Sequence, residues 1–214
     1  IARNMGCRVI GIAGSDEKCA WLTGTLGIDQ AINYKTQDVA AALAAVEGGI
    51  NVYFENVGGA LLDAALPNMA MYGRIGICGL IEGYTSDSGL PGPARFDQIL
   101  MKRLTVKGIF LPDFLAKGAN YYAPLKAWYD DGRLVGDFDQ TDGIENVLVS
   151  FERLMRGQNL GKVLVGLRSF DLFSVFIPVY VFLAIPVLSA LAGDPERFLE
   201  RNAKIQWGIT VCVF

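Results

Sequence analysis

The turn after the first expected strand carries residues that could hold a nucleotide phosphate. In the stretch RVIGIAGSDEK, Gly14, Ser15 and Lys18 follow an apolar run at 8–13. Where a dinucleotide meets such a strand end, an acidic residue binds the free 2′-hydroxyl of NAD, whereas small and basic residues accommodate the 2′-phosphate of NADP. The alternative is that Ser15 only caps a helix and that Lys18 is a solvated surface charge, and spacing alone favours that alternative.

A glycine-rich turn that brings backbone N–H groups against a pyrophosphate is missing between the first strand and the first helix. Gly73, Gly76 and Gly79 of GRIGICG have a regular spacing, but they lie on an apolar strand instead of opening a helix. We therefore interpret these glycines as structural. The run at 8–13 is then the second strand of a dinucleotide-binding unit, with the turn where the adenosine ribose docks directly after it.

The composition excludes several classes of function. With 19 Lys and Arg against 22 Asp and Glu, the formal charge is −3, which leaves no basic field for nucleic acid. The sequence has no histidine, and its cysteines form no C-x-x-C pair, so neither a zinc cluster nor a disulfide framework can be built from them. We expect no bound metal and reduced, intracellular thiols. The cysteines are Cys7, Cys19, Cys78 and Cys212.

The elements that must position these residues follow a βαβ pattern, because short β-branched runs alternate with segments of helical spacing up to residue 167. The expected strands are 8–13, 31–33, 51–55, 74–78, 105–110 and 162–166. The expected helices are 16–26, 37–46, 61–70, 96–103, 121–131 and 144–156. The predicted fold class is therefore α/β, with a doubly wound, mostly parallel sheet of the Rossmann type.

The composition changes in the C-terminal fifth of the chain. Residues 172–193 are an uncharged run of 22 positions between Asp171 and Asp194, and about 20 helical residues cross a bilayer core. We favour a transmembrane-like hydrophobic helix here, since membrane helices tolerate residues such as Pro178 and Pro186. The alternative is a buried helix or strand pair of a soluble protein. Because the chain opens without methionine and ends in a second apolar run, we expect a fragment.

Several motifs occur in the order found in one enzyme family. GCRVIGIAGSDEKCAWL, AINYKTQDVAAAL, INVYFENVGG, GRIGICGLIEGY, MKRLTVKGIF and RGQNLGKVLVGL resemble the cofactor domain of NADP-dependent, zinc-independent medium-chain dehydrogenases/reductases. The resemblance covers residues 1–167 and is greatest to the branch with prostaglandin reductases and alkenal double-bond reductases. It implies that the family's substrate domain, first strand and glycine-rich loop are missing. The sheet would then be an incomplete Rossmann sheet with a gap beside its second strand.

The resemblance also implies which residues meet the cofactor, NADP. Lys18 and Tyr34 would contact the adenosine 2′-phosphate, while Cys78 would lie at a strand end above the nicotinamide. The implied cofactor-binding residues are Ser15, Lys18, Tyr34, Asn56, Gly58, Cys78, Gly79 and Asn159. Without the resemblance, Tyr34 is a strand-end aromatic residue, and the asparagines and glycines are turn formers. The sequence departs from the family at Glu55, where aspartate is usual.

The implied chemistry is hydride delivery from NADPH to the β-carbon of an α,β-unsaturated ketone or aldehyde. The charge that develops on the carbonyl oxygen needs a positioned donor in a site that excludes water. Tyr84 is the catalytic candidate, because a tyrosine hydroxyl is a suitable neutral donor. The alternative interpretation is that Tyr84 is a loop tyrosine without a catalytic role. No zinc is needed, since conjugation already spreads the charge. We expect the chain to be inactive by itself, and the resemblance implies a homodimer through the cofactor domain.

The tail has a different resemblance. Residues 170–214 are similar to an internal stretch of bacterial phosphatidate cytidylyltransferases, membrane enzymes that make CDP-diacylglycerol. We therefore expect an NADP-binding domain at 1–167 and a hydrophobic tail at 168–214, with a cytoplasmic reductase part and a possible membrane association through 172–193. Two alternatives remain open: a membrane protein derived from the cytidylyltransferase, and a membrane-tethered nucleotide-binding module without catalysis.

Overall fold

The computed structural model describes residues 1–84, 89–90, 92–115, 118–167 and 209–213. The chain divides into two compact units. The first unit comprises Ile1–Tyr122 and Val179–Phe214, and the second comprises Ala123–Pro178. The boundary that the sequence suggests, between residues 167 and 168, stays a prediction.

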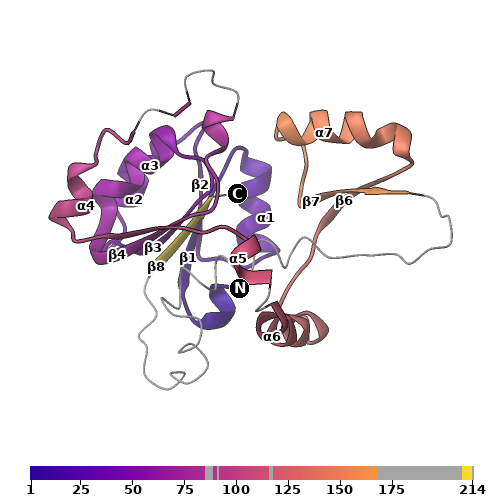
Figure 1. Cartoon of the computed structure of the whole chain (residues 1–214), viewed down its shortest axis with the longest axis horizontal. Helices are drawn as coiled ribbons and strands as arrows, with labels where there is room; N and C mark the ends of the chain where they lie inside the picture. The colour runs from indigo at the N-terminus through magenta and orange to yellow at the C-terminus, as the bar shows by residue number, and fades with distance from the viewer. Residues whose placement is uncertain (85–88, 91, 116–117, 168–208, 214) are drawn as a thin grey trace. The chain divides into compact units, whose positions relative to one another are not determined.

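The first unit contains a six-stranded sheet in the order β2-β1-β8-β3-β4-β5 (Figure 1). Every neighbouring pair in it is parallel. The strands are β1 Arg8–Ala13, β2 Gln30–Asn33, β3 Ile50–Glu55, β4 Met69–Ile77, β5 Thr105–Gly108 and β8 Ile209–Val213. The parallel sheet with connecting helices confirms the expected α/β class of Rossmann type.

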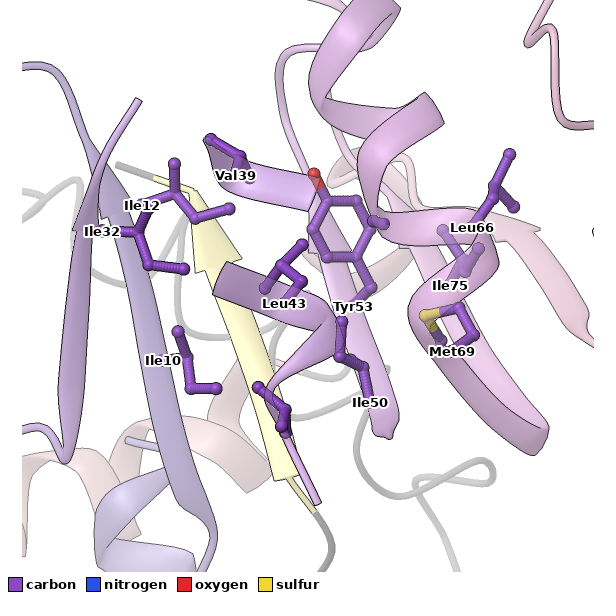
Figure 2. Close-up of a cluster of buried hydrophobic side chains, with 12 residues drawn as sticks. Ile10, Ile12, Ile32, Val39, Leu43, Ile50, Tyr53, Leu66, Met69 and Ile75 are labelled. Atoms are coloured by element: carbon purple, nitrogen blue, oxygen red, sulfur yellow. The ribbon is translucent and has the colours of Figure 1, made fainter. Parts of the chain in front are cut away.

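The centre of the sheet is closed, and the prediction of a gap beside β1 was wrong. β8 lies between β1 and β3, where Thr210 pairs with Val9 on one side and with Val52 on the other. The segment is drawn in yellow in Figures 1 and 2. Its sequence, ITVCV, is rich in β-branched residues, which favour strands, so it can satisfy the N–H and C=O groups of two strand edges.

Helices connect the strands of the first unit, and most lie where the sequence predicts them. They are α1 Asp16–Gly24, α2 Val39–Ala44, α3 Gly59–Ala65, α4 Asp97–Met101 and α5 Pro112–Leu115, followed by α6 Gly118–Asp130 at the unit boundary. The helix expected over 61–70 ends early. Pro67 lies in a 3-10 turn at Leu66–Asn68, and β4 begins directly after it, because proline removes an N–H donor and clashes with the preceding turn.

A cluster of apolar side chains holds the strands and helices of this unit together. Ile10 and Ile12 of β1 and Ile32 of β2 pack with Leu43 of α2 and with Tyr53 of β3, and all five are fully buried (Figure 2). Burying one such side chain contributes about 1.5–3 kcal/mol. The cluster therefore fixes β1, β2 and β3 relative to α2, and with them the turns at their ends.

The second unit contains a parallel pair of strands and a helix. The elements are β6 Phe138–Asp142, β7 Lys162–Gly166 and α7 Val147–Met155. Arg153 of α7 donates from Nη2 to Oδ2 of Asp139 on β6 at 2.6 Å. The sequence predicts β7 with its observed bounds but not β6, because FDQTD contains more polar residues than an ordinary strand.

The membrane-type helix expected over 172–193 lies outside the described residues. Within the part of the chain that the structure describes, no helix is both long enough and apolar enough to cross a bilayer.

Candidate cofactor-binding site

The predicted site residues of the first unit form two groups at the carboxyl ends of parallel strands, where α/β sheets bind ligands. The ribose cluster consists of Ser15, Lys18, Tyr34 and Lys35, which follow β1 and β2. The nicotinamide cluster consists of Asn56, Gly58, Cys78, Gly79 and Tyr84, which follow β3 and β4. β8 lies between β1 and β3, so one strand separates the strands that carry the two clusters.

Ser15 starts α1 and so positions Lys18. Its backbone is extended, and its Oγ accepts a hydrogen bond from the N–H of Lys18 at 3.2 Å. This is an N-cap, as the sequence predicts, and it satisfies one of the N–H groups that a helix start leaves unpaired. The side chain of Lys18 is half-buried beside the carboxyl end of β1.

Tyr34 brings its ring against the turn that follows β1. A Cβ added to Gly14 would lie 2.9 Å from the hydroxyl oxygen of Tyr34 and 3.0 Å from its ring. A side chain at position 14 would therefore collide with the ring, and glycine leaves space for it. The N–H of Tyr34 donates to the carbonyl of Ala13 at 3.1 Å. The Nζ of Lys35 lies 6.0 Å from the centre of the Tyr34 ring. These contacts place the Tyr34 hydroxyl next to the start of α1.

Asn33 holds the turn that carries Tyr34 and Lys35. Its buried side chain accepts a hydrogen bond through Oδ1 from the N–H of Lys35 at 3.0 Å. Its Nδ2 donates to Oδ1 of Asp16, in the first turn of α1, at 2.7 Å. The single amide therefore ties the end of β2 to the start of α1, which fixes Tyr34 relative to Lys18.

The ribose cluster is electropositive. The pKa of Lys18 lies below its ordinary value, first because of burial and second because of the nearby positive charge of Lys35, while Glu17 acts in the opposite direction. Two ammonium groups that repel each other at a partly buried position stabilise an anion placed between or beside them. The cluster therefore has the charge and the donors that a phosphate group requires.

The nicotinamide cluster is built from backbone contacts between the ends of β3 and β4. The N–H of Ile81 donates to the carbonyl of Asn56 at 3.0 Å. A Cβ on Gly79 would lie 3.1 Å from the carbonyl oxygen of Asn56 and 3.4 Å from its Oδ1, so the two turns approach as closely as a glycine permits. Gly58 is buried with a φ of +83°, a left-handed conformation that favours glycine.

Glu55 organises the start of α3. It is fully buried, and its Oε1 accepts hydrogen bonds from the N–H groups of Val57 at 2.5 Å and of Gly58 at 2.9 Å. Among the described residues, no donor lies within hydrogen-bond distance of its Oε2. The glutamate found where the family usually has aspartate thus still caps the turn that carries Asn56 and Gly58.

Cys78 and Tyr84 differ in their exposure. Burial raises the pKa of the Cys78 thiol, which favours its neutral form over the thiolate. Tyr84 ends a 3-10 turn at Ile81–Gly83, and 70% of its surface is exposed. The candidate proton donor is therefore accessible, and no described residue encloses it.

Asn159 lies in the second unit. Its Nδ2 donates to the carbonyl of Gly161 at 2.8 Å, just before β7. Within its own unit it has the role of a turn former, which is the interpretation that the sequence offers without the resemblance.

Sequence reasoning missed three residues of the site. Lys35 was visible in the motif NYK, and its place beside a predicted phosphate contact was the available signal. Asn33 could have been found as an asparagine that ends a strand, where its side chain often bonds the backbone two residues on. The structural role of Glu55 has no local signal beyond its position directly after an apolar strand.

No described group of three or more His, Cys, Asp or Glu side chains has an arrangement that could hold a metal ion. The sequence offers no histidine as a ligand. The donors that zinc prefers, thiolates and imidazoles, are therefore not gathered at either cluster.

Comparison with known proteins supports the assignment of the fold and its family. Residues 1–126 match the family described as zinc-binding dehydrogenase. The chain is 39% identical to prostaglandin reductase 1 of Bos taurus over 169 residues, which are 77% of this chain and 51% of that protein. It is 37% identical to the NADP(+)-dependent 2-alkenal reductase of Nicotiana tabacum over 166 residues, 77% of this chain and 48% of that protein.

A solved structure has the same fold. The crystal structure of CurA from Vibrio vulnificus in complex with NADPH superposes with a TM-score of 0.71 at 38% identity, covering 77% of this chain and 51% of that one. The chain thus spans about half the length of the relatives it matches. The match over residues 1–126, together with the parallel sheet and the motifs at its strand ends, shows that the chain belongs to the zinc-binding dehydrogenase family of medium-chain dehydrogenases/reductases.

Proposed function

We propose that this chain is the nucleotide-binding part of an NADPH-dependent reductase that acts on the C=C bond of α,β-unsaturated ketones or aldehydes. The observation that carries the proposal is the ribose cluster, in which the Nζ of Lys35 lies 6.0 Å from the centre of the Tyr34 ring and its positive charge acts on the half-buried Lys18. The names of the relatives, a prostaglandin reductase and an NADP(+)-dependent 2-alkenal reductase, agree with it.

The residues of the ribose cluster fit the 2′-phosphate that distinguishes NADP from NAD. Lys18 and Lys35 supply positive charge, the Tyr34 hydroxyl is a donor, and Gly14 leaves room for it. Asp16 at the start of α1 is held by Asn33, so it does not compete as the ribose ligand expected in an NAD site. A hydrogen bond to a charged group contributes about 1.5–3 kcal/mol, which is roughly a tenfold or greater preference for NADPH.

The nicotinamide cluster would orient the reacting end of the cofactor. When bound, NADPH supplies the hydride for the β-carbon of the substrate. Asn56 and Gly58 would hold the cofactor through the turn that Glu55 caps, and Cys78 and Gly79 would lie at the strand end above the nicotinamide ring. Asn159, in the second unit, remains a proposed contact near the nicotinamide end.

Tyr84 is the residue that we propose as catalytic. Its phenolic hydroxyl would donate a hydrogen bond to the carbonyl oxygen of the substrate, where negative charge develops as the β-carbon is reduced. The hydroxyl is exposed in the described part of the chain, and a site for this chemistry has to exclude water. We therefore expect the chain alone to bind NADPH without turning over an enone.

The family description implies zinc, but the described residues of this chain do not fit a zinc ion. Histidine is absent from the sequence, and the described carboxylates and thiols are not grouped as ligands. No step of the proposed reaction therefore depends on a metal held by these residues.

We also propose a homodimer through the cofactor domain. β5 forms one edge of the sheet, and its four residues, Thr105–Gly108, are all exposed. An exposed strand edge can pair with the same edge of a second copy. Sedimentation of the full chain would test this, because a monomer at micromolar concentration would contradict it.

The alternative functions receive less support. The relatives described above are reductases, so a membrane protein for CDP-diacylglycerol synthesis is not supported. A tethered nucleotide-binding module without catalysis differs from a reductase only in turnover. Membrane association through 172–193 falls on residues outside the described part of the chain, and the cytoplasmic location of the reductase part stays a prediction.

Two experiments test the proposed function. In the first, NADPH quenching of tryptophan fluorescence is measured for the full chain and for Lys18→Ala, Lys35→Ala and the control Lys107→Ala, an exposed lysine on β5. We expect each cluster variant to lose about tenfold or more in affinity for NADPH and the control to lose none.

In the second, the substrate domain of a family member is fused to the chain, and loss of NADPH absorbance is followed after addition of an enone. Turnover that falls strongly in Tyr84→Phe is the expected result. Binding of NADPH with no turnover of any enone or enal would favour the non-catalytic module and contradict the reductase.

A further inference from the structure

β8 is placed where it can determine the geometry of the whole cofactor site. In the six-stranded sheet, the pairs are β2-β1, β1-β8, β8-β3, β3-β4 and β4-β5. Within this sheet, the β2-β1 side is therefore connected to the β3-β4-β5 side by backbone hydrogen bonds through residues 209–213. The ribose cluster belongs to the first side and the nicotinamide cluster to the second.

The register of β8 with both neighbours is continuous. Arg8 to Ile12 of β1 pair in sequence with Ile209 to Val213, while Val52 to Phe54 of β3 pair with Thr210 to Cys212. All three strands run in the same direction, so β8 ends at the same edge of the sheet as the two clusters. Figure 2 shows the segment between the strand that carries Ile10 and the strand that carries Tyr53.

We propose that residues 209–213 act as a spacer strand, which sets the separation of the two halves of the cofactor site. The same chain supplies this strand from a segment outside the matched residues 1–126. Neighbouring strands lie about 4.8 Å apart, so one intervening strand holds β1 and β3 roughly 9–10 Å apart. The position between β1 and β3 takes a parallel strand that is rich in β-branched residues.

The physical reason is that β1 and β3 cannot leave their facing edges unpaired. Ile10, Ile12 and Val52 are buried, and buried backbone N–H and C=O groups without partners are costly. Without β8, the two strands would have to pair with each other directly. The ribose and nicotinamide clusters would then move one strand spacing closer, and a dinucleotide that spans them would no longer fit.

The assignment of the strand does not depend on the proposed cofactor, although its consequence for binding rests on the proposed function. Hydrogen exchange of the full chain tests the strand. We expect the amides of 209–213 to exchange as slowly as those of β1 and β3, because a central strand is protected on both edges. Exchange of 209–213 at the rate of an unstructured peptide, with β1 and β3 protected, would overturn the proposal.

A matched pair of variants tests the consequence for the neighbours. Val211→Pro removes an N–H from the ladder, whereas the control Val211→Thr keeps the N–H and the β-branched shape. In the proline variant, exchange in 8–13 and 50–55 should accelerate about tenfold or more while exchange in 162–166 of the second unit stays unchanged. Equal exchange in the two variants would contradict a central role of the segment.

Engineered disulfides test the register and the origin of the strand, even if the proline variant does not fold. Positions paired in neighbouring strands lie within the Cα separation of a disulfide, about 4.4–6.8 Å. Thr210→Cys should crosslink with Val9→Cys in one variant and with Val52→Cys in another. The control combines Val9→Cys with Val211→Cys, one residue out of register, and should not crosslink.

Mass spectrometry of the linked peptides distinguishes these bonds from any that involve the native cysteines. Crosslinks of 210 to both 9 and 52 within one chain support the spacer strand. Crosslinks that join two chains, or equal yields from the control, overturn it. NADPH titration of Val211→Pro and Val211→Thr then separates the two proposals: if neither variant nor the natural chain binds NADPH, the proposed function fails while the strand assignment stands.

Discussion

Lys18 carries the charge on which the proposed preference for NADPH depends. The group must be protonated to bind a phosphate, and burial together with the charge of Lys35 already lowers its pKa from the ordinary 10.5. A group with a lowered pKa loses its proton earlier as the pH rises. The affinity for NADPH should therefore fall as the pH rises, and this loss should begin at a lower pH than it would for a lysine with an ordinary pKa.

A comparison with arginine checks this at the residue scale. In Lys18→Arg the guanidinium stays protonated throughout, so the alkaline loss of NADPH affinity should move to higher pH. The affinity for NADH, which has no 2′-phosphate, should not change over the same range. Fluorescence titrations from neutral to alkaline pH measure both, and identical profiles for the natural chain and Lys18→Arg would show that Lys18 does not meet the phosphate.

Glu55 makes a separate prediction, because it is buried and accepts two backbone hydrogen bonds through Oε1. Glu55→Ala leaves the N–H groups of Val57 and Gly58 without their partner, which costs about 1–3 kcal/mol for each. Glu55→Gln keeps an acceptor of the same length and should cost less. Urea denaturation measures the difference. Equal free energies of unfolding for the two variants would contradict the capping role of Glu55.

At the scale of elements, most helices and strands of the two units could be predicted from local pattern. The apolar run at 8–13 and the lysine-led run at 162–166 have the observed bounds of β1 and β7. Ser15 before two acidic residues indicates the start of α1, which the structure confirms. These signals are local, so they can be recognised in the sequence without knowledge of the fold.

The elements that were missed depend on distant partners or on a single breaking residue. Pro67 ends α3 in a 3-10 turn before a strand that begins at Met69, although the apolar spacing alone continues the helix to residue 70. β6 has no β-branched run and owes its place to β7. β8 has a strand-like sequence, but no local pattern could show that it pairs between β1 and β3.

The cap of α1 links the stability of an element to the site. Ser15→Ala removes the acceptor for the N–H of Lys18 and should lower the free energy of unfolding by about 1 kcal/mol. It should also weaken NADPH binding, because Lys18 lies in the first turn of the helix. Thermal unfolding and NADPH titration measure the two effects.

Ser15→Asp is the variant that separates them. Aspartate caps a helix as well as serine does, so stability should be retained, yet its charge should repel the 2′-phosphate and reduce the preference for NADPH over NADH. An unchanged preference in Ser15→Asp would mean that the cofactor's phosphate does not approach this turn.

At the scale of the whole molecule, the predicted site residues of the first unit gather at one edge of its sheet, whereas Asn159 lies in the second unit. The sequence predicted them as members of one cofactor site but not as two clusters on either side of a central strand. The identity of that strand follows only from the assembled sheet. We therefore propose that this edge of the sheet recognises NADP.

Titration of the full chain with NADPH and with NADH under identical conditions is the decisive test of this proposal. We expect saturable binding of NADPH that is at least about tenfold tighter than binding of NADH, since only NADPH carries the phosphate that Lys18, Tyr34 and Lys35 would meet. Equal affinities, tighter binding of NADH, or no binding of either dinucleotide would contradict it.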